Sequence, residues 1–201
     1  MQQEKKPTRI SLKVAVVGKA GAGKYTLFSS LIHPLERDYD KKRKERSTTF
    51  VVSLSPQISM CINCLHQGGL ITPHVQNVYK GSDIVIGVCR DSIGDCPNWM
   101  EKIDPSVNRE YLFIYSGQGG EEIGEKIANE KGYFYLFIDE LKENESPEIK
   151  LRTKLLEVAE KCLRMKGIDI VSESAEWGDL PAPIPVPPQQ PVQENKGCTL
   201  I

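Results

Sequence analysis

The feature that most constrains the fold is a glycine-rich loop close to the N-terminus. The stretch Gly18–Thr26 reads GKAGAGKYT and directly follows the apolar run Val14–Val17. A glycine, four residues, then Gly23 and Lys24, placed between a predicted strand and a predicted helix, is typical of a phosphate-binding loop. Glycines let backbone N–H groups point inward around a phosphate, and the lysine reaches the outer phosphates. The alternative is a tight glycine turn that binds nothing.

The last position of this loop departs from the pattern. Tyr25 stands where serine or threonine normally coordinates the magnesium ion that bridges the last two phosphates. A phenol places its oxygen too far out, and Thr26 is turned by about 100° around a helix. We therefore expect a phosphate to dock while metal-assisted chemistry is impaired. The predicted phosphate-binding residues are Gly18, Lys19, Ala20, Gly21, Ala22, Gly23, Lys24, Tyr25 and Thr26.

Hydrophobic periodicity predicts alternating strands and helices along most of the chain. This alternation predicts an α/β fold with a mostly parallel central sheet and helices on both faces. The predicted strands are 10–17, 48–55, 57–64, 83–89, 110–115 and 133–138, and the predicted helices are 24–31, 97–103, 122–131 and 147–165. The predicted organisation is a disordered tail at 1–9, one domain at 10–167, a proline-rich flexible tether at 168–197 and a separate terminal box at 198–201.

Charge and cysteine content limit the partners and the cellular compartment that the sequence predicts. The chain has 26 basic and 27 acidic residues, so nothing global predicts a nucleic-acid partner. It shows no secretory signal and no apolar run long enough to cross a bilayer, which predicts a cytoplasmic protein. Six cysteines in the cytosol are interpreted as reduced thiols.

Cys61, Cys64 and His66 offer half of a zinc site, but core thiols are favoured because no second pair follows. The basic run 41–46 is interpreted as a solvated loop, with an acidic partner or anionic headgroups as the alternative.

Two further segments, together with the loop and the order of predicted elements, resemble the Ras superfamily of small GTPases over about residues 10–165. Tyr79-Lys80-Gly81-Ser82-Asp83 resembles the family's YYRGAD segment, and Cys198-Thr199-Leu200-Ile201 is a CaaX box. The resemblance implies a P-loop NTPase fold, GTP or GDP as ligand with Mg²⁺, protein partners of the effector or regulator type, and prenylation of Cys198. One prenyl chain gives marginal membrane residence, so we expect reversible attachment to the cytosolic face of a membrane.

Several motifs of that family are altered in this chain. The DxxG aspartate falls at Asn63 or Cys64, and the SAK motif falls at 137–139. Ala20 occupies a position that is usually glycine, where a side chain hinders hydrolysis. The remaining candidates are Gln67 for aligning the attacking water, Gln118 and Glu121 for reading guanine, and Ser47, Thr48 or Thr49 for the switch threonine, with Thr48 as the candidate metal ligand.

The altered motifs lower the affinity for nucleotide that we expect. Each lost charge-assisted contact costs about 1.5–3 kcal/mol, so three losses convert tight nucleotide binding into micromolar or weaker binding. Our hypothesis is an atypical Ras-like protein, a pseudo-GTPase, that binds guanine nucleotide weakly or not at all and acts through partners. The alternatives are a working GTP switch with divergent motifs, and a member of the septin or immunity-associated branches, which GKAGAGK also resembles.

Overall fold

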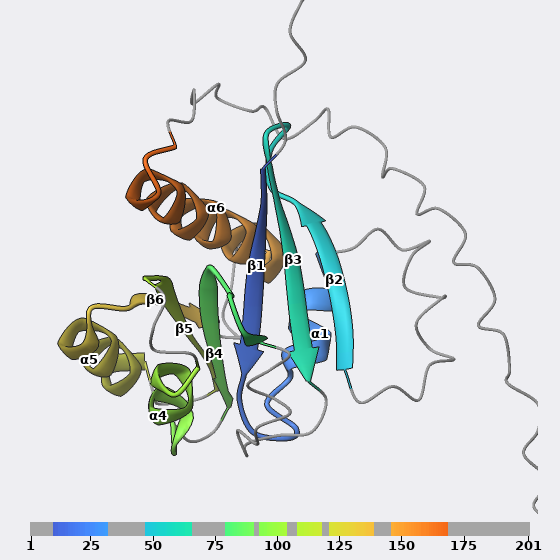
Figure 1. The fold of residues 1–201 in the computed structure, drawn as a ribbon. Coiled ribbons are helices and arrows are strands. Elements are labelled where there is room, and N and C mark those ends of the chain that lie inside the picture. Colours follow the sequence, from blue (N-terminus) through green and yellow to red (C-terminus); the bar gives the residue numbers. More distant parts are fainter. Residues whose placement is uncertain are drawn as a thin grey trace, which may run out of the picture.

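The sheet is the centre of the molecule. The computed structural model describes residues 10–31, 47–65, 79–90, 93–103, 108–117, 121–138 and 146–168. Within these ranges six strands form one sheet in the order β2-β3-β1-β4-β5-β6 (Figure 1). The strands are β1 (Ile10–Val17), β2 (Ser47–Ser53), β3 (Ile58–Leu65), β4 (Ile84–Arg90), β5 (Glu110–Ser116) and β6 (Phe134–Ile138). Neighbouring strands pair in parallel except β2 and β3, which are antiparallel.

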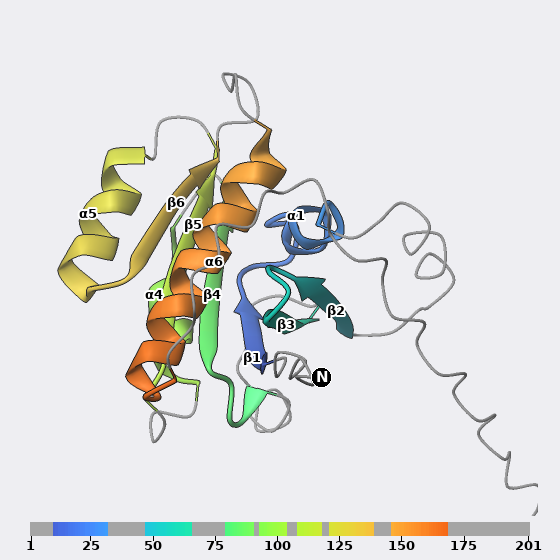
Figure 2. The same cartoon turned by 90° about the horizontal axis from the view of Figure 1, so that it is seen from above.

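Helices cover both faces of this sheet. They are α1 (Lys24–Ser29), α4 (Cys96–Glu101), α5 (Glu121–Lys131) and α6 (Pro147–Met165). Buried side chains of α1 and α6 form one core cluster with the sheet, and those of α4 and α5 form a second cluster on the other face. Figure 2 shows the same division from above, with α1 and α6 on one side and α5 on the other. The predicted α/β class, with a mostly parallel sheet between helices, is confirmed.

Every predicted strand and helix is present, and the bounds of β1 and α6 match the prediction. Three elements end two residues earlier than predicted: α1, predicted over 24–31, β2, predicted over 48–55, and α4, predicted over 97–103. At α1 the side chains show the reason. The Ser29 hydroxyl donates to the Thr26 carbonyl at 3.0 Å, and the Ser30 hydroxyl donates to the Leu27 carbonyl at 2.6 Å. Such side-chain bonds to the preceding turn compete with regular helix and favour its end here.

The antiparallel pair β2–β3 closes through a turn built on Ser55. Its hydroxyl oxygen accepts hydrogen bonds from the backbone N–H groups of Gln57 at 3.3 Å and Ile58 at 3.0 Å. A serine that bonds the backbone two or three residues ahead is a common turn device. The turn sets the register that places Phe50 opposite Ile62, and both side chains are buried in the core. The predicted strand pair around this turn is confirmed.

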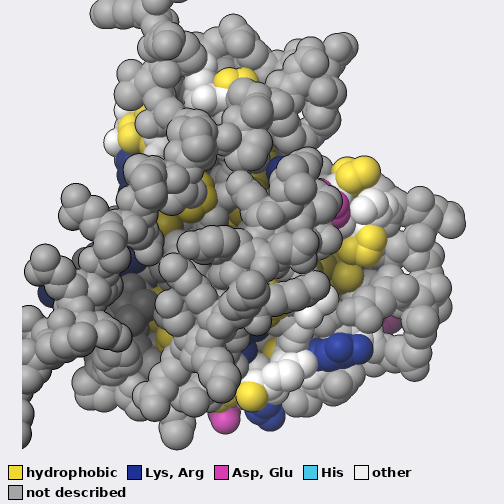
Figure 3. Space-filling model, turned by 90° about the vertical axis from the view of Figure 1, so that its right-hand side faces the viewer, with side chains coloured by type: hydrophobic (Ala, Val, Ile, Leu, Met, Phe, Trp, Pro, Cys, Tyr) yellow, Lys and Arg dark blue, Asp and Glu magenta, His cyan; other side chains and the backbone are white. Residues whose placement is uncertain are grey.

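Exposed apolar side chains do not gather on one element of the described structure. The large hydrophobic residues that remain exposed are Val51 on β2, Ile123 on α5, and Ile149 and Met165 at the two ends of α6. On the face drawn in Figure 3, the hydrophobic side chains of the described residues show as separate small areas. Single exposed apolar residues of this kind are normal on a protein surface.

Candidate functional site

The glycine-rich loop lies where the order of the sheet changes direction. It leaves the carboxyl end of β1 and enters α1. The later strands β4, β5 and β6 lie on one side of β1, and β2 and β3 lie on the other. In open α/β sheets, ligands bind outside the carboxyl ends of the strands at such a switch point. The position of the loop therefore matches a ligand-binding position.

The first glycine of the loop is packed tightly against β4. Gly18 has a φ of +150°, and a Cβ built on it would lie 2.2 Å from the carbonyl oxygen of Val88. Gly21 and Gly23 also have positive φ values, of +79° and +77°, but a Cβ on either would meet nothing within 4 Å. Gly18 is therefore required by both backbone conformation and space, and the other two by conformation.

The Lys24 side chain folds back under the loop. Its amine donates to the carbonyl oxygens of Gly18 at 2.8 Å and Lys19 at 2.6 Å, and the residue is 5% exposed. Burial lowers the pKa of this amine, and the thiols of Cys64, Cys96 and Cys89 act in the opposite direction. Within the described ranges, these hydrogen bonds occupy two of the three N–H groups of the ammonium.

A buried cation of this kind favours an anionic ligand. In the described part of the chain, the ionisable side chains that act on the Lys24 amine are cysteines, and no carboxylate is among them. The cost of taking an ammonium out of water is reduced when an anion binds beside it. The loop and its lysine can therefore hold a phosphate group.

The Tyr25 ring takes part in packing between α1 and β2. Its centroid lies 5.5 Å from that of Phe50 at an interplanar angle of 55°, and the half-buried ring packs against the core cluster that contains Phe28. The next residue, Thr26, is exposed, and its carbonyl accepts the Ser29 hydroxyl. In a phosphate-binding loop, the position of Tyr25 normally holds a serine or threonine whose hydroxyl binds Mg²⁺. In this chain it holds an aromatic ring that packs α1 against β2.

The other residues matched to metal-binding positions lie within strands. Thr48 is opposite Cys64 in the β2–β3 pair, and Thr49 is opposite Asn63. The Thr49 hydroxyl donates to the Asn63 side-chain oxygen at 2.9 Å. Cys64 is 1% exposed, and burial raises the pKa of its thiol to about 11. Asn63 and Cys64 are thus engaged in β3, opposite residues of β1 that precede the loop. The side chain of Ser47 is not among those described.

The Cys61–Cys64 pair cannot chelate one metal ion. Both residues lie on β3, and residues three apart in a strand point to opposite faces of the sheet. Cys64 belongs to the core cluster on the α6 side, whereas Cys61 is half-buried. No group of three or more His, Cys, Asp or Glu side chains placed to hold a metal occurs among the residues that the structure describes. Cys61 and Cys64 therefore do not face one another as zinc ligands, His66 lies outside the described residues, and the burial of Cys64 confirms its interpretation as a core thiol.

Tyr79 is a residue near the loop whose role sequence reasoning missed. Its phenol is 1% exposed and donates to the carbonyl oxygen of Val16 at 2.6 Å. The Tyr79 phenol oxygen in turn accepts a hydrogen bond from the backbone N–H of Leu65, and burial is the main reason that the pKa of the phenol is raised. Tyr79 thus joins the carboxyl ends of β1 and β3 beside the loop. Hydrophobic periodicity gives no sign of this bridging role, because Val16 and Leu65 are distant from Tyr79 in sequence.

The residues matched to base-reading motifs are only partly described. Glu121 is the exposed first residue of α5, and its carbonyl accepts the Tyr135 hydroxyl at 3.0 Å. Ile138 ends β6 opposite Ser116 and is 2% exposed, within the core. Gln118 lies outside the described residues. So do Gln67, the basic run 41–46, the N-terminal tail 1–9, residues 169–197 of the tether, and the final box with Cys198.

Comparison with known proteins gives no assignment: no protein-family model and no curated protein matches the sequence. In the part of the chain that the structure describes, no helix has both the length and the apolar composition that a membrane crossing needs.

Proposed function

We propose that this protein is an atypical Ras-like protein with a P-loop NTPase fold that binds guanine nucleotide weakly through its glycine-rich loop. Binding does not depend on Mg²⁺, and hydrolysis is impaired or absent. The protein acts mainly through protein partners of the effector or regulator type. Reversible attachment to the cytosolic face of a membrane, through a prenyl group on Cys198, is part of the same proposal.

The observation that supports the proposal best is the environment of the Lys24 amine. Its amine is buried beneath the loop, bonds two loop carbonyls and has a lowered pKa. The loop follows the strand at which the sheet order changes direction, which is where nucleotides bind in open α/β sheets. These features favour the retention of a phosphate site.

The weakness of the proposed binding follows from the side chains around the loop. The Tyr25 ring packs on Phe50, Asn63 is bonded by Thr49, and Cys64 is buried as a thiol. Each of these positions was matched to a group that would bind Mg²⁺ or its water. Without them, the phosphates are held by loop N–H groups and one lysine, which favours modest affinity.

The test is a thermal-shift titration of the full chain with GTP, GDP and ATP, each with MgCl₂ and with EDTA. If Kd is about one tenth of the ligand concentration, binding stabilises the fold by about 1.4 kcal/mol, or about 3–6 °C in a domain of this size. We expect a shift of that order with GTP and GDP at millimolar concentration, equal with and without Mg²⁺.

Two variants control this experiment. Lys24→Met removes the buried amine and should abolish the shift. Lys126→Met removes a lysine on α5 whose side chain is 76% exposed, and should leave the shift unchanged. Tight binding that disappears in EDTA would favour the working GTP switch instead. If no nucleotide shifts Tm, nucleotide has no part in the function.

Prenylation is tested separately. Intact-mass spectrometry of the protein from a eukaryotic host should show one added prenyl mass, and Cys198→Ser should remove it together with membrane association. An unmodified Cys198 would refute this part of the proposal.

A further inference from the structure

The helix that carries Lys24 has little stability of its own. α1 spans six residues and has no side-chain cap at its N-terminus, no acidic residue in its first turn and no basic residue in its last. Isolated helices of this length are unstable in water, because nucleation is costly and few hydrogen bonds follow. The position of α1, and of the lysine at its start, must therefore come from contacts with other elements.

Apolar contacts supply part of this support. Phe28 is fully buried, its ring centroid lies 6.3 Å from that of Phe50 on β2, and Leu31 is 4% exposed. These side chains hold one face of α1 against the sheet. Apolar packing is non-directional, so it resists lifting of the helix more than rotation or unwinding of its last turn.

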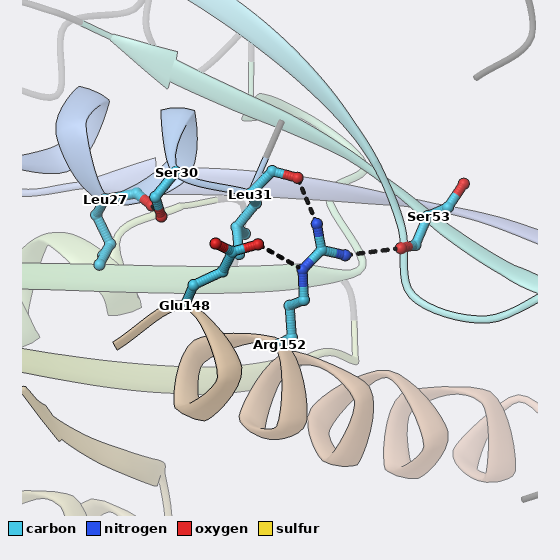
Figure 4. Close-up of polar contacts among 6 residues, drawn as sticks. All are labelled: Leu27, Ser30, Leu31, Ser53, Glu148 and Arg152. Atoms are coloured by element: carbon cyan, nitrogen blue, oxygen red, sulfur yellow. Dashed lines mark hydrogen bonds and ion pairs between the residues drawn. The ribbon is translucent and has the colours of Figure 1, made fainter. Parts of the chain in front are cut away.

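Arg152 on α6 supplies a directional contact just past the end of α1. Its Nη2 donates to the carbonyl oxygen of Leu31 at 2.5 Å, and its Nη1 donates to the carbonyl oxygen of Ser53, the last residue of β2, at 3.3 Å. Nε lies 3.3 Å from the Glu148 carboxylate, one turn earlier on α6. Figure 4 shows the guanidinium between α6 and the ends of α1 and β2.

The chemistry of these contacts suits a helix end. Leu31 lies just past the end of α1, so the bond to its carbonyl holds the chain where it leaves the helix, and the positive guanidinium near this end interacts favourably with the helix dipole. The guanidinium presents its N–H groups in a fixed planar arrangement, so bonds to Leu31 and Ser53 together set the distance between α1 and β2. The Glu148 carboxylate holds the guanidinium in that orientation.

We propose that Arg152 is a positioning residue for Lys24. Because α1 spans six residues, unwinding that begins at its Ser29 end, next to Leu31, reaches Lys24 within about two turns. Arg152 keeps α1 wound and seated, and thereby keeps the Lys24 amine under the loop against the carbonyls of Gly18 and Lys19. The consequence for phosphate affinity rests on the function proposed above, but the effect on Lys24 itself does not.

The primary test measures the accessibility of the Lys24 amine without any ligand. The folded full chain is treated briefly with acetic anhydride, and acetylation of each lysine is followed by peptide mass spectrometry. In the wild type, Lys24 should react far more slowly than the exposed Lys126. Loss of a charge-assisted hydrogen bond at a helix end should raise the labelling rate of Lys24 by about tenfold in Arg152→Met, with Lys126 unchanged.

Matched variants separate positioning from general destabilisation. Lys161→Met removes another cation of α6, which pairs with Glu110 at 3.1 Å, and should leave Lys24 labelling at the wild-type rate. Arg152→Lys keeps the positive charge but loses the fixed planar arrangement of N–H groups that reaches Leu31 and Ser53 together, so it should give an intermediate rate. If Arg152→Met does not fold, Arg152→Lys and Glu148→Gln, which removes the orienting carboxylate, test the same point.

A second readout uses tripolyphosphate, with affinity measured by calorimetry well below the unfolding temperature. Arg152→Met should weaken its binding about threefold to tenfold, while Lys161→Met should not. Equal Lys24 labelling in the wild type and all Arg152 variants would overturn the positioning role. Faster labelling in a protein that binds no tripolyphosphate would support the positioning role and refute the phosphate-binding function.

Discussion

The close approach of Gly18 to β4 gives the sharpest prediction for stability. In Gly18→Ala, the new Cβ would lie 2.2 Å from the Val88 carbonyl oxygen. That oxygen belongs to the backbone of a central strand, which pairs with β1 up to Val17 opposite Gly87. The clash therefore cannot be relieved by a side-chain rotation. The end of β1 must move away from β4, or the loop must rotate.

The cost has two parts. Overpacking of a close-packed site costs about 1–3 kcal/mol, and holding an L-residue at a φ that favours glycine costs about 1–3 kcal/mol more. Reduced freedom of the unfolded chain offsets about 0.4–1 kcal/mol of this. We expect the free energy of unfolding to fall by about 3 kcal/mol, which corresponds to a Tm lower by about 6–12 °C.

Gly21→Ala is the matched control, because it has the same chemistry in the same loop. Its φ is +79°, and a Cβ there would meet nothing within 4 Å. Backbone strain alone then predicts a loss of about 1–2 kcal/mol. Urea denaturation of both variants, with unchanged m-values, measures the difference directly. Equal losses in the two variants would refute the argument that contact with β4 constrains the start of the loop.

Three further changes test other parts of the structure. Leu155→Ala removes a fully buried side chain of α6 and should lower the free energy of unfolding by about 2–5 kcal/mol in urea denaturation; a loss under 1 kcal/mol would contradict its burial. Tyr79→Phe leaves the Val16 carbonyl and the Leu65 N–H without the phenol, so the same assay should show a loss of about 1–3 kcal/mol, and no loss would contradict the bridge. Burial raises the pKa of the Cys64 thiol from 9.0 to about 11. The neutral buried thiol therefore contributes fully to the free energy of unfolding below about pH 9, and this contribution is lost as pH rises, because the thiol of the unfolded chain ionises first. Cys64→Ala should therefore lose less stability than the wild type between pH 8 and about pH 11, by on the order of 2 kcal/mol, and parallel pH profiles would refute this.

Local patterns predicted the elements well, because a continuous apolar run, as in β4, or a hydrophobic period, as in α6, lies within the element's own residues. The buried face of α6, with Leu155, Ala159, Cys162 and Leu163, follows directly from helical spacing and is confirmed. The early end of α1 was missed because the bonds of Ser29 and Ser30 to the preceding turn compete with a pattern that otherwise favours helix.

The contacts that shape the candidate site were much harder to predict. The tilted ring contact of Tyr25 with Phe50, the bridge made by Tyr79 and the bonds of Arg152 all join residues far apart in sequence. Such contacts depend on strand order and register, which no local period encodes. The position of the loop could be predicted because it depends on a strand, a turn and a helix that are consecutive in the chain.

The place of β1 between β3 and β4 also has a kinetic consequence. The hairpin of β2 and β3 can form early, because its strands are close in sequence, whereas both neighbours of β1 are distant along the chain. Pairings of high sequence separation form slowly, since loop-closure entropy opposes them. β1 should therefore join the sheet late in folding. The glycine-rich loop, which depends on the contact between Gly18 and β4, should become native only at that last step.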